Sequence, residues 1–153
     1  KLLTKLTTVQ LKGVSQFTMN EETQKAANIG FMWDNFKSHF FGKTEENVGD
    51  LNVAIHKLEK DSLDKPILEE LGDKAEITLA HFVELLKQQS QGQEGTLLVN
   101  GWANIAYIRD KKGNLWAVDA YWLSVSRGWS VLALSVTNPR GWDAGSQVIS
   151  CDC

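Results

Sequence analysis

A chain of 153 residues, 42% hydrophobic and 23% charged, has the composition of an ordinary globular protein and is long enough to bury a core. No apolar run approaches the roughly 20 residues that span a bilayer, so we expect no contact with a membrane. The net charge of −3 at pH 7 argues against a general nucleic-acid binder, which needs a basic surface to displace counterions from phosphates.

The first half of the chain predicts a strand–helix–strand unit over residues 1–62. Loose alternation of apolar and β-branched residues favours a strand over residues 6–18. Asn20 has the character of an N-cap before two glutamates, and a helix is predicted from there to residue 41. Its apolar residues recur every three or four positions: Ala26, Ile29, Trp33, Phe36 and Phe40. A second strand is predicted over residues 49–58, with Leu51, Val53 and Ile55 facing inward.

The rest of the chain, residues 63–153, predicts a helix followed by a tryptophan-rich sheet. A helical turn between Pro66 and Gly72 precedes a helix over roughly residues 75–90. A segment rich in Gln and Gly then marks the change to a period of two. Four strands joined by short turns predict a meander, with the strands at residues 97–108, 115–125, 129–136 and 147–150.

These elements predict an α+β fold. Two main helices, residues 20–41 and 75–90, are expected to pack on one face of a mainly antiparallel sheet that ends in the four-stranded meander. We expect a single domain, or two subdomains that divide between residues 62 and 63.

Five of the six tryptophans lie between residues 102 and 142. On the strand predicted over residues 115–125, even spacing places Trp116 and Trp122 on one face, while Asp119 and Tyr121 lie on the other. Since both faces carry large apolar groups, one can meet the helices and the other something else. The indoles either fill the core or line an aromatic pocket for a small apolar or planar ligand. In the second case, the predicted ligand-binding residues are Trp102, Asn104, Trp116, Asp119, Tyr121, Trp122, Arg127 and Trp129. Arg140 is expected to supply a further polar contact.

Asp119 interrupts a strongly apolar strand. A carboxylate buried there must be paired or must have a shifted pKa, and such groups often mark functional sites. The structural alternative is a solvent-facing position, or an ion pair with Arg109 or Arg127.

No motif identifies catalytic or cofactor chemistry. The three histidines, His39, His56 and His81, lack metal-ligand spacing, and no nucleophile elbow or glycine-rich phosphate loop is present. Cys151 and Cys153 alone offer too few ligands for a soft metal. We therefore expect no catalytic residue, metal or cofactor.

The same two thiols favour a cytoplasmic protein, because secreted domains that depend on disulfides use several pairs and because no secretory signal pattern opens the chain. The first residue is Lys1 and not Met, which is compatible with removal of an upstream leader, tag or domain.

The runs Leu11–Ser15, Ile29–Phe36 and Asp50–Asp61 resemble the opening of GyrI-like domains, the effector-binding domains of certain bacterial transcription regulators. In that family a strand with a Gly-hydrophobic motif precedes a helix containing Trp-x-x-Phe, and the next strand ends in an acidic turn. The resemblance implies a cleft between two βα units that binds an apolar cation or a protein partner without catalysis. The remaining residues do not continue the family's pattern, so no functional residue is carried over.

Helices followed by long antiparallel strands are also similar to NTF2-like folds, which host ligand binders and small enzymes.

The sequence thus favours a non-enzymatic binding module for a small ligand. The first alternative is a protein-interaction or assembly domain, for example a homodimer, since aromatic residues are enriched in interface cores. The second is a small hydrolase or isomerase that uses Asp119. Neither nucleic acid nor membrane is an expected partner.

Overall fold

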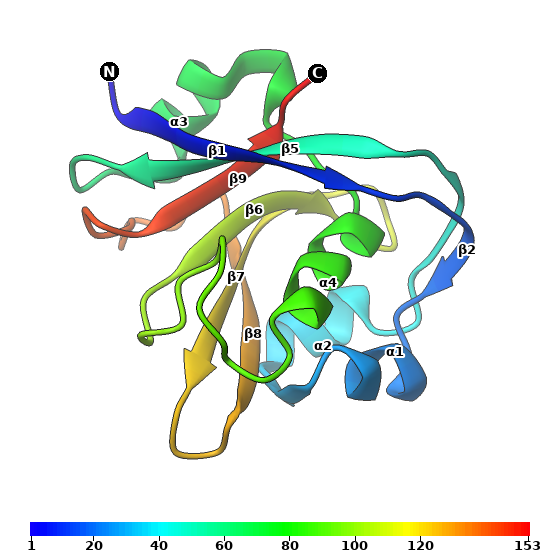
Figure 1. The fold of residues 1–153 in the computed structure, drawn as a ribbon. Coiled ribbons are helices and arrows are strands. Elements are labelled where there is room, and N and C mark those ends of the chain that lie inside the picture. Colours follow the sequence, from blue (N-terminus) through cyan, green and yellow to red (C-terminus); the bar gives the residue numbers. More distant parts are fainter.

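A computed structural model describes the whole chain, residues 1–153, as nine strands, four α-helices and one short 3-10 helix. Seven strands form one mixed sheet in the order β1-β5-β9-β6-β7-β8-β3, and β2 and β4 form a separate small sheet. The strands are β1 (Leu3–Leu11), β2 (Val14–Thr18), β3 (Ile29–Met32), β4 (Thr44–Val48), β5 (Leu51–Leu58), β6 (Asn104–Arg109), β7 (Leu115–Leu123), β8 (Gly128–Ser135) and β9 (Gln147–Cys151). The helices are α1 (Glu21–Ala26), α2 (Asp34–Phe40), α3 (Asp64–Leu71), α4 (Leu79–Gln88) and the 3-10 helix η1 (Gly72–Lys74). The large sheet is strongly twisted, so β1 and β5 run across the direction of β7 and β8 (Figure 1).

The predicted fold class, two main helices on a mainly antiparallel sheet that ends in a four-stranded meander, is wrong. Strands hold 41% of the residues and helices 22%, and four helices accompany a seven-stranded mixed sheet and a two-stranded sheet. Three local errors contribute to this difference. The single strand predicted over residues 6–18 is divided at Gly13 into β1 and β2, and β2 pairs with β4, a strand that was not predicted. The other two errors lie in the helix predicted over residues 20–41 and in the last strand.

The helix predicted over residues 20–41 is interrupted by a strand. Asn20 does cap a helix, since its side chain accepts a hydrogen bond from the Thr23 amide at 3.0 Å. That helix, α1, ends at Ala26, because Asn28 adopts a φ of +58° that no right-handed helix contains. The chain then forms β3, which pairs in parallel with β8, and it becomes helical again only at α2.

The last strand does not continue the meander. Only β6, β7 and β8 follow one another as antiparallel neighbours. β9 lies between β5 and β6, antiparallel to the first and parallel to the second. To reach that position, the chain after β8 crosses the sheet and forms a bridge in which the backbones of Ser62 and Trp142 exchange two hydrogen bonds, at 3.0 and 2.8 Å.

The two faces of the large sheet bury different clusters. The main core lies on the face covered by α2 and α4, and it includes Phe36, Phe82, Trp122 and Trp129. A smaller cluster lies on the opposite face, where Ile67 of α3 packs with residues of β5, β6, β7 and β9. The predicted alternation along β7 is confirmed, because Val118, Ala120 and Trp122 belong to the first cluster and Ala117 to the second.

A disulfide joins Cys151 and Cys153 at the C-terminal end of the chain. It encloses a single residue, so it constrains almost none of the unfolded chain.

The longest helix, α4, has ten residues, and no helix combines the length and the apolar character needed to cross a membrane.

Candidate functional site

A cavity of about 630 Å³ opens on the face of the sheet opposite α4. Its base is formed by β7 and β8, where Asp119 pairs with Leu132. Alternation of side chains brings Tyr121 and Leu134 to the same face. The walls come from the start of α2, from the loop before β6 and from the crossing segment between β8 and β9, which contribute Trp33, Trp102, Arg140, Trp142 and Asp143.

Three tryptophans at this cavity are held in place by specific contacts. The Trp33 indole N–H donates to the Tyr121 hydroxyl at 3.0 Å. The Trp142 indole N–H donates to the Asp64 carboxylate at 2.7 Å. Trp102 packs on Gly145, where an added Cβ would lie 2.9 Å from the ring. Since each ring is fixed by its neighbours, the walls are organised without a ligand.

Asp64, behind the wall, is a structural carboxylate. Its Oδ1 also accepts a hydrogen bond from the Tyr107 hydroxyl at 2.7 Å, and the residue is buried. Burial raises the pKa of Asp64, while the bonds from Trp142 and Tyr107 oppose that rise. It therefore anchors the crossing segment to α3.

Asp119 is the only charged side chain that is buried at this cavity. The residue is 6% exposed. The only hydrogen bond that its side chain forms within the chain comes from the Asn104 backbone amide to Oδ1, at 3.2 Å. Burial raises the pKa of Asp119 to about 7, and the Asn104 hydrogen bond opposes that shift only in part. The other oxygen, Oδ2, has no partner in the chain and is not sealed from solvent, so it opens onto the cavity.

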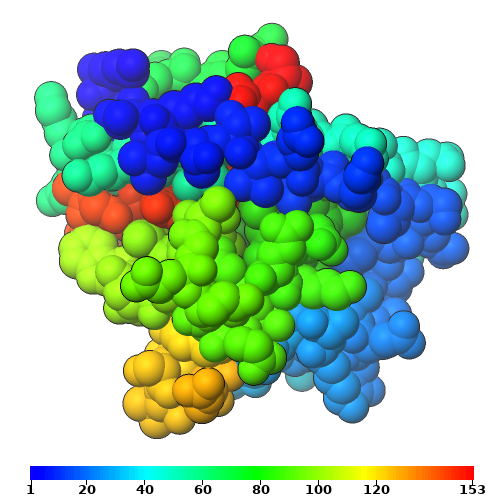
Figure 2. All heavy atoms as spheres, viewed as in Figure 1, coloured from blue at the N-terminus to red at the C-terminus, as the bar shows by residue number.

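The structural alternatives for Asp119 do not apply. The side chain does not face bulk solvent, and no cation forms an ion pair with it. Arg109 is engaged elsewhere, since its guanidinium donates two hydrogen bonds to Glu76, at 2.9 and 2.8 Å. Arg127 lies in the exposed turn between β7 and β8, whose tip stands out from the body of the molecule (Figure 2).

The structure divides the predicted ligand-binding residues into two groups. Trp102, Asp119 and Tyr121 line the cavity. The remaining five do not line it: Asn104, Trp116, Trp122, Arg127 and Trp129.

Four of those five belong to the opposite face or to its rim. Trp129 is fully buried, and its indole N–H donates to a carbonyl of α4, while Trp122 packs edge-on against it at 5.4 Å between ring centroids. Trp116 packs against the main core and donates to Asp110 at 2.8 Å. The Asn104 amide bonds the backbone of Leu98 and Ala120.

Arg140, expected as a further polar contact of the pocket, also lines the cavity. Two tryptophans that line it, Trp33 and Trp142, were not among the predicted residues. The sequence pattern assigns Trp33 to the buried stripe of a helix, whereas it precedes α2 and is half exposed. Trp142 lies in the crossing segment, and only the turn residues before it indicate a loop.

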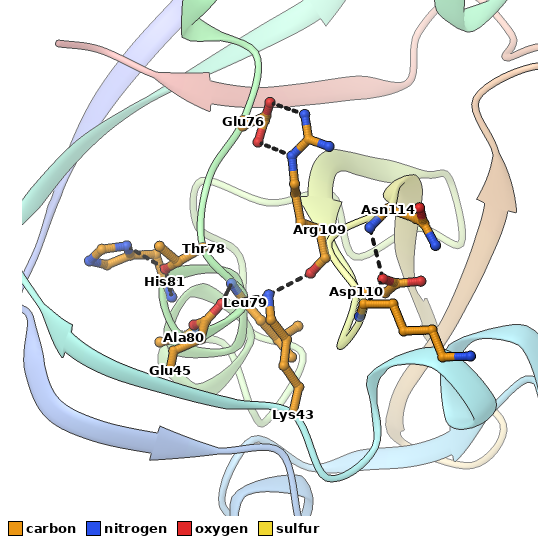
Figure 3. A network of polar contacts seen from close by, with 11 residues as sticks. Lys43, Glu45, Glu76, Thr78, Leu79, Ala80, His81, Arg109, Asp110 and Asn114 are labelled. Atoms are coloured by element: carbon orange, nitrogen blue, oxygen red, sulfur yellow. Dashed lines mark hydrogen bonds and ion pairs between the residues drawn. The ribbon is translucent and has the colours of Figure 1, made fainter.

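A second polar cluster, at the start of α4, is structural (Figure 3). Both oxygens of Glu45 accept hydrogen bonds from the first backbone amides of α4, at 3.0 and 2.8 Å, and Lys43 pairs with the same carboxylate. Next to it, both ring nitrogens of His81 are bonded, to Thr78 and to the Gly49 carbonyl. These groups therefore satisfy one another's hydrogen-bonding capacity.

A Ser–His contact also occurs outside the cavity. The His56 Nε2 lies 2.9 Å from the Ser150 hydroxyl oxygen, but Ser150 is only 1% exposed, so a substrate cannot reach it. No group of three or more His, Cys, Asp and Glu residues could hold a metal ion.

Comparison of the chain with protein-family models, curated proteins and solved structures finds no match.

Proposed function

We propose that the chain is a binding module that accepts a small ligand with a planar apolar part in the cavity over β7 and β8. One observation carries this proposal: three indoles, each fixed by its neighbours, surround a hollow of about 630 Å³ with a buried carboxyl group at its base. Cavities of this size suit small molecules, and apolar walls with a few placed polar groups are typical of ligand sites.

The six indole N–H groups provide a test with a built-in control. In a ¹H–¹⁵N spectrum, titration with quinoline, benzimidazole or 2-naphthol should shift the indole resonances of Trp33, Trp102 and Trp142. Those of Trp122 and Trp129 should stay in place, because both rings are buried on the other face. Trp102→Ala should weaken the shifts at the two remaining cavity indoles. If no compound moves a cavity resonance, or if core and cavity resonances move together, the proposal fails.

A protein-interaction role is the second candidate. The observation that favours it is a set of exposed aromatic rings: Trp33 and Trp102 at the cavity, exposed at 48% and 46%, and Phe31, exposed at 53%, which packs edge-on against Trp33. Aromatic residues of this kind are enriched in interface cores. Light scattering over a range of concentrations separates the two roles, because a dimer that dissociates in Trp33→Ala supports assembly and a constant monomer supports the ligand site.

A catalytic use of Asp119 is the third candidate, because a carboxyl group with a pKa of about 7 suits general acid or base chemistry near neutral pH. It requires turnover of a compound that binds the cavity, and Asp119→Asn should then abolish turnover while binding persists. Unchanged turnover in that variant would eliminate this candidate.

A further inference from the structure

The base of the cavity presents a hydrogen-bond acceptor that the chain leaves unused. A carboxylate offers about four lone-pair positions, and Asn104 occupies one of those on Asp119. Lone pairs therefore remain on both oxygens. Water or a ligand must supply the missing donors, because a buried acceptor without a partner is unfavourable.

We propose that the cavity takes a planar, protonated nitrogen base whose edge carries two adjacent N–H donors, such as an amidinium, a guanidinium or a protonated 2-amino heterocycle, held by the Asp119 carboxylate. This inference rests on the proposed function and specifies the chemical class of its ligand.

Paired donors suit Asp119 better than a positive charge alone. Two parallel N–H groups match the two oxygens of a carboxylate, and such bidentate pairs are stronger than single hydrogen bonds. A quaternary ammonium has the charge but no N–H group, so it leaves the lone pairs of a desolvated carboxylate without donors.

The mouth of the cavity does not select for charge by itself. It carries one cation, Arg140, and one anion, Asp143, both exposed. The other residues that line the cavity from β8, from the start of α2 and from the loop before β6 are uncharged. Discrimination between ligands of different charge therefore depends on the base, where Asp119 is the ionisable group in reach.

The walls favour a flat ligand with a further acceptor. Indole rings and the side chains of Leu132 and Leu134 provide surfaces for stacking. Tyr121 is two residues beyond Asp119 on the same face, about 7 Å along the strand. Its hydroxyl oxygen accepts from Trp33, which leaves its own O–H free to donate into the cavity.

Three probes built on one phenyl ring test the inference on the unaltered chain. Benzamidine has a planar edge with paired N–H donors, phenyltrimethylammonium has the same charge without N–H groups, and acetophenone is flat, neutral and without N–H groups. Calorimetry should show benzamidine binding about tenfold or more tightly than either other probe, as expected for hydrogen bonds to a charged group.

Two matched variants locate the effect. Asp119→Asn should remove the preference for benzamidine, and Asp143→Asn, which changes the net charge equally at the mouth, should retain it. If phenyltrimethylammonium binds as tightly as benzamidine, charge alone is recognised and the inference is overturned. If acetophenone equals benzamidine, or if Asp119→Asn keeps the preference, Asp119 does not select the ligand. In each of these cases the proposed function stands, because probes still bind the cavity. It falls together with the inference when no planar compound shifts a cavity indole, or when core and cavity indoles shift together.

Discussion

The substitution Asp119→Asn should make the folded chain more stable at neutral and alkaline pH. An asparagine has nearly the same shape as aspartate, and its carbonyl oxygen can still accept the hydrogen bond from the Asn104 amide. It cannot ionise, so it avoids the cost of placing a charge in a buried position without an ion-pair partner.

The size and the direction of the effect follow from the pKa of Asp119. That pKa is about 7 in the folded chain, whereas an aspartate in an unfolded chain titrates near pH 4. Between these values the folded state keeps a proton that the unfolded state has lost, so stability falls as the pH rises. Each pH unit in this range lowers the free energy of unfolding by about 1.4 kcal/mol. The total loss approaches roughly 4 kcal/mol once the pH exceeds the pKa of Asp119 in the folded chain.

Urea unfolding at several pH values between 4 and 8 measures this loss. The difference in unfolding free energy between Asp119→Asn and the parent chain should be small at pH 4, grow through pH 7 and then level off. Taking the difference cancels the other carboxylates, such as Asp64, whose pKa burial also raises, and Glu70, whose pKa is lowered. Asp143→Asn, at an exposed site, should show no such growth. A difference between Asp119→Asn and the parent chain that stays constant with pH would mean that Asp119 has the same pKa in the folded and unfolded chain and is therefore solvated, which would remove the reason for expecting a ligand donor beside it.

Three other substitutions probe how the scaffold is held together, each by urea unfolding. Trp129→Phe should cost about 2 kcal/mol or more, because it leaves a void in the main core and removes the indole hydrogen bond to a carbonyl of α4. Glu45→Gln should cost about 1 kcal/mol by weakening the cap of α4 shown in Figure 3, whereas Glu46→Gln on the exposed side of β4 should change little. Gly13→Ala should cost about 2–3 kcal/mol, since its Cβ would lie 2.0 Å from a backbone carbonyl of β4, and Gly49→Ala, with open space around it, serves as the control.

The parts of the fold that could be predicted are those that local periodicity determines. Alternation along β7 separates Trp122 from Asp119 whatever the sheet packs against, because successive side chains of a strand point to opposite faces. The interruption of an apolar strand by Asp119 was a correct signal of a buried carboxyl group. The observed α4 also lies within the helix predicted over residues 75–90.

The helix predicted over residues 20–41 shows why periodicity can mislead. Ile29 and Met32 are the two buried ends of β3, three residues apart, and this spacing is also that of a helical stripe. The signal that could have distinguished a strand from a continuous helix here is Asn28. Asn adopts left-handed backbone conformations more readily than most residues and so often ends a helix.

The missed strand order and the missed cavity residue Trp142 have a common cause. The segment after β8 crosses the sheet because its backbone pairs with Ser62, and this contact joins residues 80 positions apart, which no local pattern encodes. The same crossing delivers β9 to its place between β5 and β6 and brings Trp142 to the cavity over β7.

The position of the cavity follows from how unevenly the sheet is covered. α3 occupies the face opposite α4 only along one side, where Ile67 packs with Leu58, Tyr107 and Val148. Over β7 and β8 that face has no helix, and the crossing segment bridges it at one border only. A third apolar residue in place of Asp119 could pack with Leu132 and Leu134 and reduce the hollow, whereas a carboxyl group there keeps an affinity for water and for N–H donors. The unfavourable burial of Asp119 and the open space in front of it are therefore two consequences of one arrangement, and a variant that stabilises the fold by removing the charge should weaken the site.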